Sequence, residues 1–388
     1  MAFVENTSLF NFPEGDLPII VTHRGQQITG RVSSKALCLA SPVFEKFIYP
    51  PFGRLSPAKN EPPVTCTGRE KSQTEFSLEE KPAMIAKSVE QNECADCDII
   101  ENGVKNCKLA STKSNQEVAP GLMFGGHIDF QEDNAESLRL LFQIAHFQFN
   151  KVPLKLQFDT LLGIAHLCEI YQCVHLVLPW LDSWLEGGMK ECAEAGKEEY
   201  LFIAWSFGRA DLFTECANNL INEVYLIDGL PAVNRGFVRY LDDIEGLPPK
   251  AIEAILQART AKLERLLDIP YKTARDILSS RPIYKCLANE KLCDSLIYGS
   301  LILTLSDIEL WPEKVPAMIN ISVKRLTTQL ACLDVQVLPD SRYKTHKACK
   351  FDIDKAARII YCEKVDCTLD SHIRHIKTQE RKLARPTE

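Results

Sequence analysis

The stretch Val32–Phe52, VSSKALCLASPVFEKFIYPPF, decides the fold that this sequence predicts. Ser33 can cap a short helix, which must end before Pro42, because the residue before a proline avoids the α region. A second helix can begin at once. Ser41 is placed as its N-cap, and Pro42 takes the first helical position, where a missing N–H costs nothing. A Pro-Pro pair then ends it. The stretch therefore predicts two short packing helices joined at Ser-Pro.

Two short strands precede these helices. The segment Ile19–Val32, IIVTHRGQQITGRV, is rich in β-branched residues on both sides of Arg24-Gly25. Glycine tolerates positive φ, so this dipeptide is typical of a tight turn between paired strands. The predicted order is strand, turn, strand, helix, helix.

With Asp16 ahead of the first strand and LASPVFEKF after the second, this order resembles the start of a BTB/POZ domain of the type found in filamentous fungi. The resemblance resumes at Gly125–Pro153, similar to the third strand and following helix, and at Leu154–Leu185, similar to the last helical pair. It covers about half of the chain and implies an α+β BTB/POZ domain, a small sheet capped by helices. Many animal members have a histidine where this chain has Ser33, so no ligand groove that depends on that histidine is expected.

The composition divides the chain into four parts. We expect an N-terminal tail at 1–15, a BTB/POZ domain at 16–190, a mainly α-helical domain at 191–338 and a basic Cys/His-containing segment at 339–388. Residues 55–120 lack periodicity and are rich in Lys, Glu, Ser, Asn and Pro, which predicts a disordered insertion within the BTB/POZ domain. Its four cysteines, Cys66, Cys94, Cys97 and Cys107, include one tight pair, so unpaired cysteines are favoured over a zinc site.

The overall composition points to an intracellular protein. The chain has 388 residues, 45% of them hydrophobic, and a formal net charge of −7. No apolar run approaches the ~18 residues of a membrane span, and the first residues do not resemble a signal peptide. We expect the cytoplasm or the nucleus, with no membrane partner. The 15 cysteines are then expected to be reduced, many of them in cores.

The basic C-terminal segment contains the candidate metal ligands. His346 and Cys349 are separated by two residues, as are His372 and His375. Such gaps can bring two ligands to one metal, so zinc is one hypothesis. The favoured interpretation is that two amphipathic surface helices carry solvated histidines, with no cofactor and no metal.

Motifs of catalysis were not found. The sequence has no G-x-S-x-G, no P-loop, no H-E-x-x-H and no G-x-G-x-x-G motif. His166 and Glu169 can share a helix face, but their neighbours are apolar, which favours a partly buried structural histidine. We therefore predict no catalytic and no cofactor-binding residues, and a protein that is not an enzyme.

The resemblance implies a protein–protein interaction module or scaffold, in some members an adaptor for a cullin-type ubiquitin ligase. The scaffold-facing surface would be the strand at 127–131 and the helix at 135–149. In that helix Leu140, Ile144 and Phe147 fall outside the core stripe, which makes them candidate interaction residues. The alternative is that they are buried against the second helical domain. A nuclear transcription-associated factor is the alternative function. The excess of positive charge in the basic segment is small, however, so nucleic-acid binding is not expected.

The apolar residues of the N-terminal tail indicate that the protein self-associates. Its apolar residues, Phe3, Val4, Leu9, Phe10 and Phe12, would be exposed on a monomer unless something covers them. BTB/POZ proteins commonly dimerise, so we expect a homodimer in which the tail packs on the partner. The alternative is a tail that folds back on its own domain.

Overall fold

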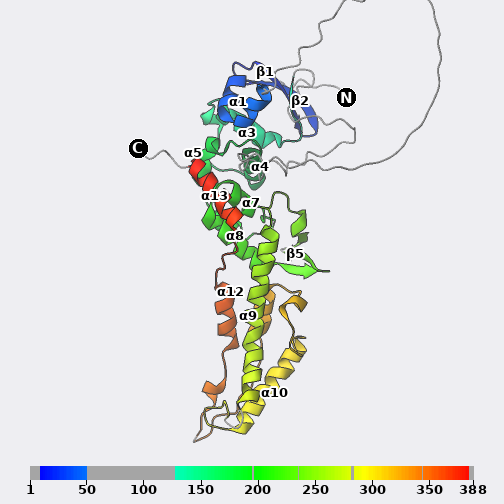
Figure 1. Cartoon of the computed structure of the whole chain (residues 1–388), viewed down its shortest axis with the longest axis vertical. Helices are drawn as coiled ribbons and strands as arrows, with labels where there is room; N and C mark the ends of the chain where they lie inside the picture. The colour runs from blue at the N-terminus through cyan, green and yellow to red at the C-terminus, as the bar shows by residue number, and fades with distance from the viewer. Residues whose placement is uncertain are drawn as a thin grey trace, which may run out of the picture. The chain divides into compact units, whose positions relative to one another are not determined.

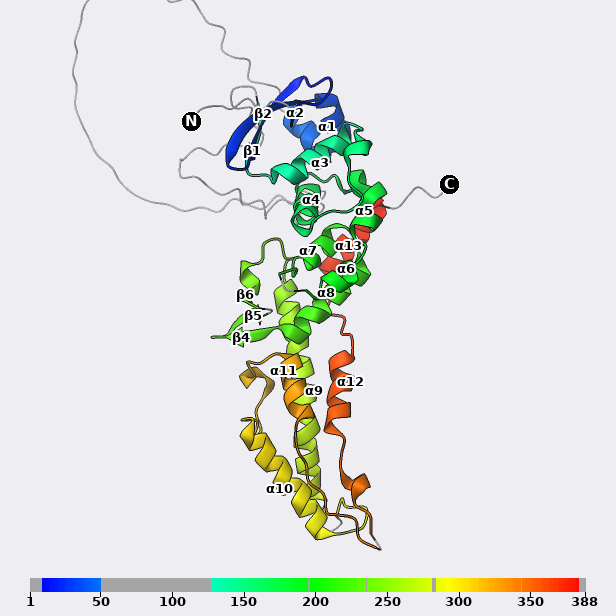
Figure 2. The same cartoon turned by 180° about the vertical axis from the view of Figure 1, so that it is seen from behind.

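The computed structural model describes residues 9–49, 127–194, 196–234, 236–280, 284–342 and 344–383 (Figures 1 and 2). These residues form a mixed α+β structure that is mostly helical and includes two small three-stranded sheets. The contacts discussed below lie within one compact unit made of residues 1–45 and 123–388. The insertion predicted at 55–120, with its four cysteines, lies outside the described residues. None of the described helices is both long and apolar enough to span a bilayer.

The elements follow one another along the chain with these bounds. They are β1 Leu17–His23, β2 Gln26–Val32, α1 Ser34–Ala40, α2 Pro42–Ile48, β3 Ile128–Phe130, α3 Ala135–Ala145, η1 Phe149–Lys151, α4 Phe158–Ile170, η2 Val174–Val177, α5 Leu178–Trp184, α6 Gly188–Glu191, α7 Tyr200–Ser206, α8 Ala210–Glu223, β4 Tyr225–Ile227, β5 Leu230–Asn234, β6 Val238–Tyr240, η3 Leu241–Asp243, α9 Ala251–Ser279, α10 Lys291–Asp307, η4 Pro316–Met318, α11 Val323–Ala331, η5 Lys347–Cys349, α12 Ile353–Cys362 and α13 Asp370–Leu383.

The first sheet is built on the predicted hairpin. β1 pairs antiparallel with β2 and parallel with β3, so the strand order is β2-β1-β3. Arg24 and Gly25 both have positive φ, 52° and 74°, which is the turn that matches the twist of paired strands. Alternate residues of β1 are buried, with Ile19 and Val21 fully so. The hairpin predicted from the sequence is confirmed.

Helices α1 and α2 begin as Ser33 and Ser41 predict. The Ser33 side chain accepts a hydrogen bond from the Ala36 N–H. The Ser41 hydroxyl accepts from the N–H groups of Val43 and Phe44, at 3.0 and 3.1 Å, and donates to the Tyr171 carbonyl at 2.5 Å. Ser41 therefore caps α2 and also ties it to the end of α4.

Helix α3 is shorter than the sequence predicts. Asn134 caps it through the Ser137 N–H, but it ends at Ala145 rather than near 149. Phe147 follows with φ 59°, a left-handed conformation that is uncommon for a residue with a side chain. This reversal ends the helix and carries the chain into η1, so residues after Ala145 do not continue the helical stripe.

The N-terminal tail folds back on its own domain. Phe12 donates its N–H to the Arg31 carbonyl at 2.9 Å, and the Arg31 N–H donates to the Phe10 carbonyl at 3.0 Å. Phe10 and Phe12 are buried, and Phe12 stacks on His146 with ring centroids 4.4 Å apart. We expected Phe10 and Phe12 to pack on the partner of a homodimer, but both are buried within their own domain. Phe3 and Val4 lie outside the described residues, and Leu9 is partly buried.

The region after α6 is mostly helical, and it also contains a small sheet that the prediction of a mainly α-helical domain at 191–338 did not include. Helices α7 and α8 meet at Gly208, where an added Cβ would lie 2.6 Å from the Glu380 backbone nitrogen of α13. The second sheet, β4-β5-β6, then follows where a helical segment was expected. Its first turn is Asp228-Gly229, both with positive φ.

Helix α9 organises the C-terminal part. It runs from Ala251 to Ser279 with Pro270 inside it. Helices α10, α11 and α12 all pack against it, as Figure 2 shows. The segment predicted as a separate basic region at 339–388 contains two helices, as expected, but α12 packs on α9 and α13 returns to α7.

Candidate metal centre

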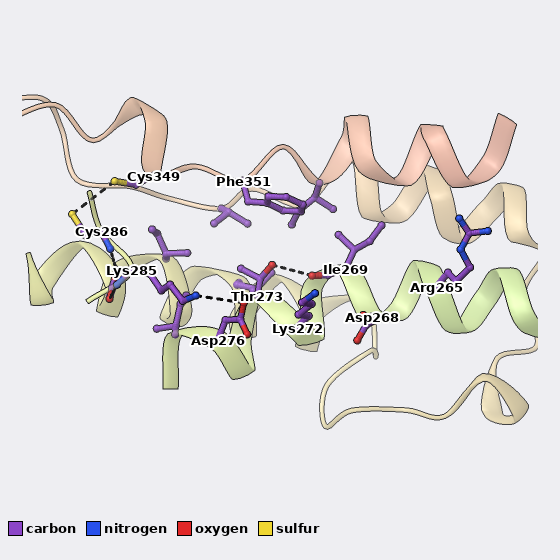
Figure 3. A pocket seen from close by; sticks show the side chains of 16 residues that line it. Arg265, Asp268, Ile269, Lys272, Thr273, Asp276, Lys285, Cys286, Cys349 and Phe351 are labelled. Carbon is purple, nitrogen blue, oxygen red and sulfur yellow. Dashed lines mark hydrogen bonds and ion pairs between the residues drawn. The ribbon is translucent and has the colours of Figure 1, made fainter. Parts of the chain in front are cut away.

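Four side chains from separate parts of the C-terminal region converge on one point. Cys286 lies between α9 and α10, Cys293 in the first turn of α10, and His346 and Cys349 around η5. One donor atom from each lies within 4.8 Å of all the others. The Cys286 Sγ is 3.4 Å from the His346 Nδ1 and 3.7 Å from the Cys349 Sγ. Figure 3 shows Cys286 and Cys349 at one end of a groove.

A single 3₁₀ turn brings His346 and Cys349, which are separated by two residues, to the same side of the chain. The Cys349 N–H donates to the His346 carbonyl at 2.9 Å, so both side chains leave the same side of η5. The His346 N–H in turn donates to the Asp340 carboxylate at 2.7 Å. His346 is buried, which fixes its ring beside Cys286.

The buried carboxylate of Asp294 links the other two ligands. It accepts hydrogen bonds from the backbone N–H groups of Lys285 and Cys286, at 2.7 and 2.8 Å. Asp294 is also the residue after Cys293 on α10. One side chain therefore sets the approach of the Cys286 loop to the helix that carries Cys293.

The thiols differ in their ease of ionisation. Burial raises the pKa of Cys286. Hydrogen bonds lower it by a larger amount, and they come from the backbone N–H groups of Glu290 and Ala288 and from the thiols of Cys349 and Cys293. The pKa of Cys286 is therefore lowered overall. Burial raises the pKa of Cys293 to about 12. Hydrogen bonds therefore make the Cys286 thiol easier to ionise than an ordinary thiol, whereas burial makes the Cys293 thiol harder to ionise.

The cluster is not a disulfide. A sulfur–sulfur bond is about 2.05 Å long, far shorter than the 3.7 Å between Cys286 and Cys349. The cysteines of the cluster are free. Three sulfurs and one imidazole nitrogen at these separations form a donor set for a soft or borderline divalent cation.

The sequence candidates divide into two groups in the structure. His346 and Cys349 lie in the cluster, while His372 and His375 lie on α13 with other partners. Cys286 and Cys293 were not identified from the sequence. They are six residues apart instead of two to four, and they stand in segments that are typical of helical core. The signal that could have found them is their order, a Cys pair followed by His-x-x-Cys.

His372 and His375 are not solvated, in contrast to the favoured interpretation. His372 is buried, donates from its Nε2 to the Pro249 carbonyl at 2.8 Å and accepts from the Leu369 N–H at 3.4 Å. His375 stacks on Trp205 with ring centroids 3.6 Å apart, and its Nε2 is 3.6 Å from the Glu169 carboxylate. These contacts make them anchors of α13.

The burial of His375 predicts an acid-sensitive contact. Burial, and then the charges of Lys382 and His372, lower the pKa of His375 to about 4 from 6.5. The unfolded chain therefore binds a proton between pH 6.5 and 4 while the folded chain does not, so folding stability falls as pH falls through that window. Glu169 faces the ring, but burial raises its pKa, so it becomes a weaker counter-charge in acid.

We expect His375→Phe, which keeps a ring against Trp205, to reduce this pH dependence by roughly 2 kcal/mol between pH 7 and 4. Urea unfolding curves of both proteins at several pH values measure it. Equal pH dependence in the two proteins would contradict the assignment.

The candidate interaction residues also divide. Leu140 and Ile144 are buried, and α3 packs mainly on α4, α1 and η2. The prediction that these two residues form an interaction surface is therefore wrong. Phe147 is 74% exposed. Its ring lies 5.9 Å from that of Phe149, which in turn lies 5.5 Å from Trp180. We call Phe147, Phe149 and Trp180 the aromatic patch.

A groove lies beside the metal-ligand cluster. It has a volume of about 410 Å³ and is lined by charged residues of α9, by apolar side chains of α9, α10 and the chain before α12, and by Cys286 and Cys349 (Figure 3). No protein-family model, curated protein or solved structure matches this chain.

Proposed function

We propose that this protein is a non-catalytic scaffold that binds other proteins through a BTB/POZ-like N-terminal region. The observation that carries the proposal is the aromatic patch on that region. Phe147 and Phe149 are 74% and 50% exposed and lie side by side. The nearby Leu154 is also exposed. Exposed aromatic residues in a group are typical of protein interaction surfaces, whereas single exposed residues are ordinary.

The conformation of Phe147 supports this role. Its φ of 59° places the ring outside α3, and the cost of a left-handed conformation is not offset by burial of the side chain. A partner that covers the ring would recover the missing apolar contact. In the BTB/POZ resemblance, the surface formed by the third strand and the following helix faces the cullin-type scaffold. The partner we propose is therefore a cullin-type ubiquitin-ligase scaffold.

A charge at position 147 tests the proposal. We expect Phe147→Glu to leave the thermal unfolding midpoint within about 2 °C of wild type, because the side chain is exposed. The same variant should reduce capture of a cullin by tenfold or more, since a carboxylate would be desolvated at the contact. Capture of purified cullin N-terminal domains measures this.

The matched control is Leu39→Glu on α1. Leu39 is 81% exposed and is not part of the aromatic patch, so the control adds the same charge to another exposed apolar position. It should bind like wild type. If wild type captures no cullin, the adaptor role is wrong and a scaffold for other proteins remains to be tested by identifying what co-purifies. If Phe147→Glu binds as well as wild type, the patch is not the contact.

A nuclear nucleic-acid-binding role is less well supported. Several bases of the C-terminal segment pair with carboxylates. Lys344 pairs with Glu290, and Lys364 with Glu215 at 2.7 Å. Such pairs reduce the positive field that would attract phosphates.

A further inference from the structure

We propose that Cys286, Cys293, His346 and Cys349 together bind one zinc ion, which fixes the irregular chain before α12 to the start of α10. The proposal does not depend on the scaffold function. It concerns a closed structural site, in which protein side chains fill all four coordination positions.

The separations fit a tetrahedral zinc ion. With zinc–sulfur bonds of about 2.3 Å and zinc–nitrogen bonds of about 2.0 Å, tetrahedral angles place two sulfurs about 3.8 Å apart and a sulfur about 3.5 Å from a nitrogen. The structure has 3.7 Å between Cys286 and Cys349 sulfurs, and 3.4 Å between the Cys286 sulfur and the His346 Nδ1. These two separations therefore match tetrahedral coordination, and all four donors lie within 4.8 Å of one another.

The ligands are held in place by other groups. Asp294 orients the Cys286 loop, and Asp340 orients His346 through its N–H. Backbone N–H groups of Ala288 and Glu290 are directed at the Cys286 sulfur. Amide donors of this kind stabilise a metal-bound thiolate, and outer groups that orient ligands are a regular part of metal sites.

The surrounding chain needs such a tether. Between α11 and α12, residues 333–346 have no helix or strand where the structure describes them. Irregular segments of this length are uncommon inside a compact unit unless something holds them. Val335 of this segment is buried in the core, but Leu287 before α10 and Leu292 in its first turn are exposed. A zinc ion bound from both sides would supply the missing constraint.

The donor set favours a structural over a catalytic ion. Catalytic zinc keeps one position for water or substrate, whereas three thiolates and one imidazole fill a tetrahedron. The groove beside Cys286 and Cys349 therefore borders the site without offering it an open position (Figure 3).

The test uses the full chain purified under reducing conditions. Elemental analysis should find zinc, and Cys293→Ser should lower the content by one ion per chain. Cys332→Ser removes an exposed cysteine outside the cluster and should leave it unchanged. Counting the difference excludes any contribution from the cysteines at 66–107. Chelation should lower the unfolding midpoint of wild type by on the order of 5 °C.

Two further measurements keep the proposal testable if Cys293→Ser does not fold. Wild type exchanged into cobalt(II) should show the intense visible absorption of tetrahedral thiolate coordination. His346→Cys, which replaces one ligand by another, should retain the ion. Metal-free wild type that also fails to bind cobalt would overturn the proposal. Unchanged zinc content in a folded Cys293→Ser variant would overturn it equally.

Discussion

Replacing Arg259 by leucine should destabilise the protein by about 3–5 kcal/mol, more than any exposed substitution. The guanidinium is buried on α9 and donates to three carbonyls: Val224 at 3.0 Å, and Ile319 and Ile321 at 2.8 Å each. These carbonyls belong to the end of α8 and to the chain before α11. Leucine would fill most of the space but leave all three without this donor.

The control for this prediction lies on the same helix. Arg265 is about half exposed and pairs with Glu363 at 2.6 Å, so Arg265→Leu should cost less than about 1 kcal/mol. Urea unfolding at neutral pH, followed by circular dichroism, compares the two variants. If Arg259→Leu lies within 1 kcal/mol of wild type, the carbonyls have found other donors and Arg259 does not join the three segments.

Local chemistry explains which elements could be predicted. The caps at Ser33 and Ser41 and the turn at Arg24-Gly25 depend on residues within four positions, so the sequence contains their cause. The same logic could have found the second sheet. Asp228-Gly229 is a hairpin signal, but the surrounding residues were assigned only to a mainly helical domain.

Contacts between distant segments explain what could not be predicted. Arg259 and Lys262 look like ordinary charges of an amphipathic helix, yet both are buried and bind carbonyl or amide oxygens of other elements. The candidate metal centre likewise depends on contacts between segments that are far apart in the sequence. The spacing of His346 and Cys349 was visible, but Cys286 and Cys293 join them only because α9 and α10 bring that loop to η5.

The second large effect is expected at Phe142, the centre of the N-terminal core. The Phe142 ring lies 5.5 Å from that of Phe130, 6.0 Å from Phe12 and 6.1 Å from Phe44, measured between centroids, and it is fully buried. It therefore joins the tail, the sheet and α2. Phe142→Ala removes these edge-to-face contacts and leaves a cavity, so it should cost about 3–5 kcal/mol.

Phe147→Ala is the matched control, because it removes the same side chain five residues later at an exposed position. Its effect on the free energy of unfolding should stay within about 0.5 kcal/mol. Chemical unfolding followed by circular dichroism measures both variants. A small loss at Phe142 would mean that the surrounding rings collapse into the space. A large loss at Phe147 would mean that this ring supports the fold, and the effect of Phe147→Glu on cullin capture could then no longer be assigned to a lost contact.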